Sequence, residues 1–474
     1  MPEPLATIKQ ERWTIRSDLN LRNLGIALIA IFAGLLCALA PWWVSGGVLV
    51  GIVVVVLVVR DPFFGLMLTL AFSAQAIPGA LVPNIPLGGA LILPCEIMLL
   101  LTLTSSLLNG ISGRHPFVHV SRDFLIAALL SLGALLASIF VGKFVLGQKD
   151  FAFQVLRNFL PLTLLPLLPS ILCNRRRIAL AEGFFIAFGV LIALFIALQA
   201  FTSLELLTGR LEDLGRNQTT GVTRTVLWGP ELLVILALFL IGRQGLRFCL
   251  SRLWPVPAVT ILLLGLMGTY TRSFWVATLV AAVLLAVFAK GIKGGLRLAA
   301  IVVPIVVVLG AAVFVVNPRI GAAAFDRAFG ITKEIESGDS FGWRGKENAM
   351  AIEAIAKHPV LGIGFNGVYK PSISTHGHFE GEEIYIHNAY LYFQLKMGLF
   401  GAAILIAFLA LYVRLARAAF SIADAQDRVS ALSYVVLGVV VMMIGYSGQT
   451  ISRFVTLLIV CLMFSIIKSY ARHD

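Results

Sequence analysis

The residues best suited to chemistry lie near position 387, where a long hydrophilic stretch meets an apolar one. His387 and Asn388 stand at this boundary, and Gly398 and Gly401 follow within the apolar run. An imidazole has an ordinary pKa of about 6.5, so His387 can exchange a proton near neutral pH and is a candidate general base. The plainer interpretation is a histidine at the membrane surface that only anchors the next helix. On a helix from Asn388, the two glycines would offer a face for close packing.

Two arginines indicate a phosphate ligand. Arg272 lies at a corner between two apolar runs, two positions after Tyr270, and Arg344 lies with Lys346 in the hydrophilic stretch. A guanidinium binds phosphate oxygens bidentately, so two of them suit a pyrophosphate. Each arginine also has a plainer interpretation, since Arg272 can extend to lipid phosphates and Arg344 can be a solvated helix residue. The combination of these two arginines with His387 indicates a functional site more specifically than any one of the three residues does alone.

The elements that position these residues are predicted to cross a membrane. Of the 474 residues, 59% are apolar and 13% are charged, whereas about a quarter are charged in an average soluble domain. The apolar runs suffice for about 12–14 transmembrane helices of roughly 20 residues each. The formal net charge of +13 comes from short basic segments between these runs, which indicates membrane topology and anionic lipids rather than nucleic acid. The predicted fold class is an all-α polytopic membrane protein.

The distribution of apolar and charged residues divides the chain into three parts. Residues 1–316 hold transmembrane helices with short loops, residues 317–386 form one long loop, and residues 387–474 hold the last transmembrane helices. Lys and Arg concentrate in the loops that a cytoplasmic start makes internal. This bias places both termini in the cytoplasm and the long loop outside.

The long loop is predicted to contain one helix. Asp339 or Ser340 can cap its start, and the helix stops before Pro359. A glycine-rich turn follows the helix. A loop of this length is seldom a mere connection.

The chain resembles the bacterial O-antigen ligases and the related O-antigen polymerases between about Thr269 and Gly401. The most specific part is the ligase-type pattern of His, then Asn, Ser or Gln, then nine residues, Gly, two residues, and a small residue or Tyr. The positions that match this pattern are His387, Asn388, Gly398 and Gly401. The remaining matches are Arg272 at the outer end of a central span, Arg344 in the loop helix, and Pro359, Gly362 and Gly364 in the turn.

The resemblance implies a glycosyltransferase at the outer face of the bacterial inner membrane that needs neither metal nor cofactor. A glycan would leave undecaprenyl pyrophosphate for a sugar hydroxyl. Arg272 and Arg344 would hold the pyrophosphate, on which negative charge develops. His387 would position or deprotonate the acceptor hydroxyl, and Asn388 would orient the ring or the sugar. The expected acceptor is the lipid A core, as in a ligase, and the alternative is a second lipid-linked repeat unit, as in an O-antigen or exopolysaccharide polymerase.

Further basic residues are candidates for substrate binding. Arg210, Arg216 and Arg224 fall in an outside loop and can bind glycan or phosphate, or else form a charged surface helix. Lys346 and Tyr270 stand beside the two central arginines and join them as expected substrate-binding residues.

Three other interpretations remain open at this point. The first is a metal site in the long loop, with ligands from His376, His378, Glu380, Glu382, Glu383 and His387. The second is a transporter or lipid flippase, which would place ionisable residues deep in several spans. Only Glu96, Arg157 and Lys396 look deep in the sequence, and the other charges gather outside. The third, a structural scaffold, leaves the arginines and the histidine of the loop unexplained.

Overall fold

The computed structural model describes residues 42–77, 85–87, 90–111, 121–148, 152–202, 206–207, 210–213, 223–227, 229–243, 255–318, 321–322, 324–325, 340–371 and 382–472. These residues are mostly helical, and their strands form two short antiparallel hairpins. The prediction of an all-α polytopic membrane protein is confirmed.

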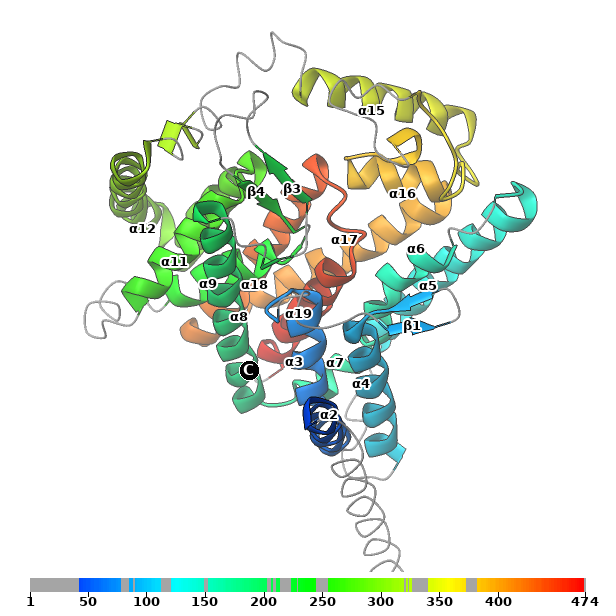
Figure 1. Cartoon of the computed structure of the whole chain (residues 1–474), viewed down its shortest axis with the longest axis horizontal. Helices are drawn as coiled ribbons and strands as arrows, with labels where there is room; N and C mark the ends of the chain where they lie inside the picture. The colour runs from blue at the N-terminus through cyan, green and yellow to red at the C-terminus, as the bar shows by residue number, and fades with distance from the viewer. Residues whose placement is uncertain are drawn as a thin grey trace, which may run out of the picture.

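The elements follow one another along the chain as in Figure 1. The first half contains α2 (Trp42–Arg60), α3 (Pro62–Ser73), β1 (Ile85–Leu87), β2 (Ala90–Ile92), α4 (Pro94–Ile111), α5 (Arg122–Phe140), the π-helical turn η2 (Val141–Val145), α6 (Ala152–Phe159), the 3-10 turn η3 (Leu160–Thr163), α7 (Leu168–Ile171), α8 (Arg175–Phe201), β3 (Arg210–Asp213) and β4 (Thr223–Val226). The second half contains α9 (Glu231–Gly242), α11 (Pro255–Gly268), α12 (Arg272–Val316), α15 (Ser340–Lys357), the 3-10 turn η4 (Glu382–Ile384), α16 (Ala389–Met397), α17 (Leu399–Phe420), α18 (Ala425–Ser447) and α19 (Phe454–Tyr470).

Five helices of the described residues are long and apolar enough to cross a membrane. They span Arg122–Val145, Arg175–Ala200, Arg272–Ala289, Leu399–Phe420 and Ala425–Ser447. The shorter apolar helices are Leu49–Arg60, Pro62–Ser73, Glu231–Gly242, Pro255–Gly268 and Phe454–Tyr470. The sequence also contains an apolar run at 24–40, which is predicted to be the first span. This run lies outside the described residues, so the number of spans stays a prediction.

Two predicted spans are not single straight helices. The apolar run 151–172 is divided into α6, η3 and α7, because prolines at positions 161 and 169 cannot donate the backbone hydrogen bonds of a continuous helix. By contrast, α12 covers two apolar runs, 274–289 and 298–316, that the sequence predicts as separate spans, and its kink at Gly291, whose φ is 71°, lies between them. The prediction of one helix from Asn388 through Gly401 is wrong, because the backbone leaves helical geometry at Gly398 and separates α16 from α17.

The helix ends show which parts of the chain share one end of the bundle. α5 packs against α17. Near the start of α5, Oδ2 of Asp123 lies 2.7 Å from Nη2 of Arg414 on α17. Beyond the other end of α5, Nε2 of Gln148 donates to the carbonyl oxygen of Ile363 at 2.6 Å. The turn that contains Ile363 therefore lies at the opposite end of the bundle from this ion pair.

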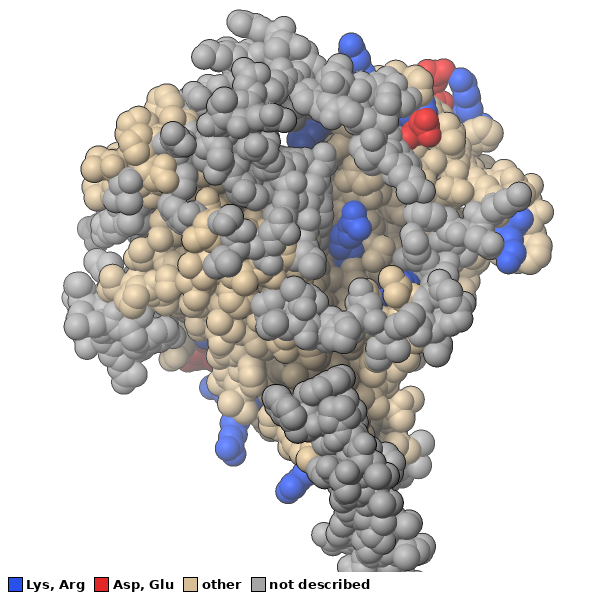
Figure 2. Space-filling model, in the orientation of Figure 1, with Lys and Arg blue, Asp and Glu red and all other residues tan. Residues whose placement is uncertain are grey.

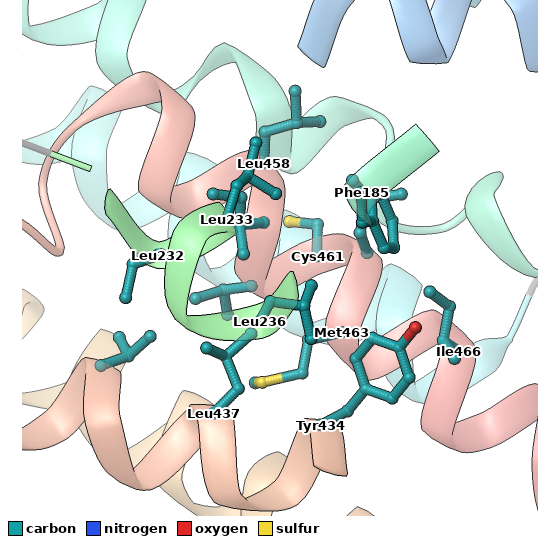
Figure 3. Close-up of a cluster of buried hydrophobic side chains, with 14 of the residues drawn as sticks. Phe185, Leu232, Leu233, Leu236, Tyr434, Leu437, Leu458, Cys461, Met463 and Ile466 are labelled. Atoms are coloured by element: carbon teal, nitrogen blue, oxygen red, sulfur yellow. The ribbon is translucent and has the colours of Figure 1, made fainter. Parts of the chain in front are cut away.

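The centre of the bundle is a continuous apolar core. α8, α9, α18 and α19 pack together there, and Figure 3 shows Phe185, Leu236 and Met463 gathered around Tyr434. The hydroxyl of Tyr434 donates to Oε1 of Glu182 at 3.2 Å. This buried carboxylate also receives bonds from Tyr470 and Arg243, so its charge is compensated within the core. The core is thus a closely packed support for the residues at the bundle ends.

Candidate functional site

α15 is the helix predicted in the long loop, and it ends at Lys357, before Pro359 as expected. It packs against α16 (Figure 1). Glu347 and Ala351 are four residues apart and both buried, so they lie on the face of α15 toward the protein. Lys346 lies on the opposite, exposed face. This arrangement presents the buried face of a loop helix to the segment that carries His387.

Glu347 connects α15 to the start of α16 through His387. Its Oε2 atom lies 2.9 Å from the backbone nitrogen of His387 and 2.9 Å from Nδ1 of the same residue. Its Oε1 atom accepts a hydrogen bond from Nζ of Lys370 at 2.5 Å. The side chains of Glu347 and Lys370 are fully buried, whereas 12% of the His387 side chain is exposed. The carboxylate is held from three directions, and the imidazole retains one route to solvent.

The electrostatics of this cluster determine the protonation state of His387. Burial alone would raise the pKa of Glu347, but the hydrogen bonds from His387 and Lys370 hold that pKa below its usual value. Glu347 is therefore an anion, which only accepts hydrogen bonds, so the hydrogen of the neutral imidazole lies on Nδ1. Nε2 then carries the lone pair and is the nitrogen that can take up a proton.

The pKa of His387 lies below its ordinary value. Burial lowers it, the hydrogen bond and the charge of Glu347 raise it, and the positive charges of Arg344 and Lys370 lower it again. The neutral form of the imidazole is therefore favoured at neutral pH. The influence of Arg344 also means that its guanidinium lies close enough to His387 for their charges to interact.

Aromatic rings contact the imidazole. The ring centroids of Trp343 and His387 are 4.8 Å apart and the rings are nearly perpendicular. Tyr385 makes a similar edge-to-face contact at 4.9 Å. Nζ of Lys370 lies 4.6 Å from the centroid of the Trp343 ring, in cation–π geometry. The imidazole is thus fixed by packing as well as by its bond to Glu347.

The glycine-rich turn after α15 is attached to the break between α16 and α17. The backbone nitrogen of Ile363 donates to Leu395 at 2.8 Å, and that of Leu399 donates to Val360 at 3.0 Å. Gly362 and Gly398 both have positive φ, at 67° and 57°. A Cβ on Gly398 would overlap the carbonyl oxygen of Val360. Glycine is therefore required at the break because two backbones meet there at contact distance.

Two further residues serve this local structure. Asn388 is the N-cap of α16, since its Oδ1 accepts from the backbone nitrogens of Tyr390 at 3.0 Å and Leu391 at 3.3 Å. Lys396 is fully buried, and its Nζ donates to the carbonyl oxygen of Gly367 at 2.8 Å. The two side chains position the start and the end of α16.

Arg272 begins α12 at the corner that follows α11. The corner is held by Nε1 of Trp275, which donates to the carbonyl oxygen of Leu266 at 2.8 Å. Tyr270 is buried with a φ of 45°, a conformation that non-glycine residues seldom adopt. Arg272 itself is half-buried. The tight corner therefore fixes the backbone position from which the Arg272 side chain extends.

The two central arginines stand on elements with different neighbours. Among the described elements, α12 packs against α9, α11 and α18, whereas α15 packs against α16. A cavity shared by Arg272 and Arg344 stays a prediction. Figure 2 shows basic side chains inside a hollow on one face of the molecule, and both basic and acidic side chains at its outer edge near α15. The basic side chains in the hollow suit an anionic ligand.

The predicted basic loop contains a β-hairpin rather than a surface helix. Arg210 pairs with Val226, and Glu212 pairs with Arg224, across β3 and β4. Arg216 lies outside the described residues. The hairpin places the backbones of Arg210 and Arg224 near each other, in adjacent strands.

The described residues bear differently on the metal-site interpretation and on the transporter interpretation. In the alternative metal site, His376, His378 and Glu380 lie outside the described residues. The deep residues that a transporter would use are paired in the structure. Nη2 of Arg157 lies 2.9 Å from Oε2 of Glu96 and donates to the carbonyl oxygen of Leu91 at 2.7 Å.

Glu347, Lys370 and Trp343 are site residues that sequence reasoning missed. Their only signal was spacing, because Trp343 and Glu347 are four apart on the predicted helix. In sequence Glu347 looked like one solvated charge beside Lys346. Its burial depends on the packing of α15 against α16, which no local pattern reveals.

Comparison with known proteins identifies the region that carries this site. No curated protein matches the chain. Residues 257–406 match the model of the O-antigen ligase family. The match begins in α11, ends within α17, and includes Arg272, Arg344, Glu347 and His387. Over this segment the chain is similar to the O-antigen ligase family, as the sequence pattern around His387 predicted.

Proposed function

We propose that the protein is a membrane glycosyltransferase that moves a glycan from undecaprenyl pyrophosphate to a sugar hydroxyl at the outer face of the bacterial inner membrane. The reaction needs neither metal nor cofactor in this proposal. The observation that carries it is the contact between Glu347 and His387, because it leaves Nε2 of a neutral imidazole as a base beside Arg344. The family match supports the same class of reaction.

His387 acts on the acceptor in the proposed reaction. Nε2 takes the proton of the acceptor hydroxyl while the oxygen attacks the anomeric carbon of the donor glycan. The bond from that carbon to the pyrophosphate oxygen breaks, and undecaprenyl pyrophosphate leaves with the electron pair. Glu347 remains an anion and stabilises the imidazolium that forms, since its carboxylate accepts the Nδ1–H bond throughout.

Arg272 and Arg344 act on the leaving group. Negative charge increases on the pyrophosphate as its bond to the sugar breaks, and fixed guanidiniums stabilise that charge more strongly than the starting state. Arg344 is well placed for this role because its charge already acts on His387. Arg272 is presented by the tight corner before α12, and the β3–β4 hairpin supplies Arg210 and Arg224 as further candidates for the glycan or its phosphates.

The proposed acceptor is the lipid A core, which makes the protein a ligase. The pattern of His387, Asn388, Gly398 and Gly401 is of the ligase type and supports this choice. A polymerase would use a second lipid-linked repeat unit, which offers the same kind of hydroxyl to the same base. The two reactions differ in product rather than in the chemistry of the site.

The experiment is to reconstitute the purified protein with a lipid-linked glycan and offer either a lipid A core or more of the lipid-linked glycan. A ligase joins the glycan to the lipid A core and leaves the lipid-linked glycan at its original length. Longer lipid-linked glycans would show a polymerase instead. Release of undecaprenyl pyrophosphate without transfer to either acceptor would contradict the proposed reaction.

A further inference from the structure

Trp343 carries a hydrogen-bond donor that has no partner within the described part of the structure. Among the buried side-chain atoms of the described residues, Nε1 of Trp343 is one that has no hydrogen-bond partner. A buried indole N–H usually finds a partner, because an unpaired buried donor destabilises the folded state. Trp275 shows the ordinary case, because its Nε1 donates to the carbonyl oxygen of Leu266.

The indole of Trp343 is held firmly where it lies. Its ring contacts His387 edge to face, and Nζ of Lys370 lies over it at 4.6 Å. Lys370 is itself paired with Glu347, one helical turn from Trp343 on α15. The N–H therefore belongs to a side chain that packs against His387 and Lys370, and the ring cannot turn to find another partner without disturbing these contacts.

The position of the indole N–H indicates which ligand it binds. The indole offers one neutral hydrogen-bond donor beside His387. Arg344, the next residue in the chain, carries a guanidinium, which is the better ligand for phosphate. The molecule that must approach Nε2 of His387 is a sugar with a free hydroxyl. Binding pockets of this kind combine aromatic walls with a few placed polar groups, and Tyr385 supplies a second aromatic ring against His387.

We propose that Trp343 and Tyr385 form the acceptor subsite, in which the indole N–H of Trp343 donates to an oxygen of the acceptor sugar while His387 receives the hydroxyl proton. The inference rests on the proposed glycosyl transfer and adds the residues that select and orient the acceptor. The ligand is a pyranose unit with a hydroxyl free to react, and the donor's pyrophosphate is bound elsewhere in the site.

Trp343→Phe tests the subsite because it keeps an aromatic ring and removes only the N–H. Loss of one hydrogen bond of about 0.5–1.5 kcal/mol should raise the KM for the acceptor by about threefold to tenfold. The kcat at saturating acceptor, the binding of the lipid-linked donor and the pH profile should stay unchanged. Tyr412→Phe is the matched control, since it removes a half-buried aromatic donor on α17 that is bonded to the carbonyl oxygen of Val435, and it should leave the acceptor KM unchanged.

Two results would overturn the subsite. An unchanged acceptor KM in Trp343→Phe would show that the N–H binds no acceptor. A lower kcat with a shifted pH profile and an unchanged KM would show that Trp343 only supports His387. Trp343→Ala, measured over a range of acceptor concentrations, guards against a small effect in the Phe variant and should raise the acceptor KM further. His387→Ala separates the two proposals: if it abolishes transfer while Trp343→Phe is normal, only the subsite fails, and if it transfers normally, the proposed function fails.

Discussion

Nδ1 of His387 lies 2.9 Å from Oε2 of Glu347, and this contact joins the loop helix α15 to the start of α16. The same carboxylate neutralises Lys370, which is fully buried. One anion therefore has two tasks, since it orients the imidazole and compensates a buried cation. Substitutions at Glu347 and Lys370 can separate these two tasks.

Glu347→Gln tests both the orientation of the His387 imidazole and the compensation of the Lys370 charge. The amide can donate as well as accept, so Nδ1 is no longer forced to carry the hydrogen, and transfer should fall by ~10²-fold or more. Lys370 would also lose its partner, and removal of one partner from a buried pair destabilises by about 3–5 kcal/mol. The measurements are the transfer rate and the melting temperature.

A second substitution completes this test. Glu347→Gln combined with Lys370→Met removes both buried charges, so stability should recover while transfer stays low. Glu353→Gln is the control on the same helix, because Glu353 is exposed and pairs only with Lys357 among the described residues. Recovery of transfer in the double variant would show that Glu347 serves stability alone.

The pH dependence of transfer should reflect the lowered pKa of His387. The neutral imidazole is the active form, so activity is present above its pKa and lost as the pH falls through it. Because burial and the charges of Arg344 and Lys370 outweigh the opposing effect of Glu347, the loss should occur below pH 6.5 or so, the ordinary value for histidine. Arg344→Gln removes one positive charge and should move the midpoint to higher pH. The readout is kcat against pH at saturating donor, and a midpoint that moves downward would exclude His387 as the titrating base.

Gly398→Ala should disrupt the junction between α16 and α17. An alanine there would need a φ of 57° and would overlap the carbonyl oxygen of Val360, which should cost at least about 1–3 kcal/mol. The melting temperature and the transfer rate should both fall. Gly133→Ala on α5 is the control, since a Cβ at that position meets nothing within 4 Å. Equal stability of the two variants would show that the turn does not depend on this contact.

The orientation of the bundle can be read from thiol labelling. Cys173 is exposed near the start of α8, and Lys346 is exposed on α15. In spheroplasts of a Lys346→Cys strain, an impermeant thiol reagent should label position 346 at once and Cys173 only after lysis. Labelling in the reverse order would place α15 in the cytoplasm and exclude an outward-facing site.

The candidate residues could be selected from sequence, whereas their geometry could not. His387 and Arg272 stood out because ionisable residues lie there at the ends of apolar runs, Arg344 because it lies on the predicted loop helix, and the end of α15 could be predicted because proline ends helices. The break at Gly398 could not be predicted, since the apolar run is continuous there and the positive φ arises from contact with Val360. The burial of Glu347 has the same kind of cause, because it requires α16 to pack on one face of α15.

The central claim is that His387 acts on the acceptor while the arginines hold the donor. The most direct measurement compares donor binding with glycan transfer in purified, folded His387→Ala and Arg272→Ala proteins. His387→Ala should bind the lipid-linked donor normally and transfer its glycan ~10²- to 10⁴-fold more slowly. Arg272→Ala should bind the donor about 10- to 100-fold more weakly, as expected for the loss of charged hydrogen bonds. Near-normal transfer by His387→Ala would contradict the claim and leave His387 as an anchor for α16.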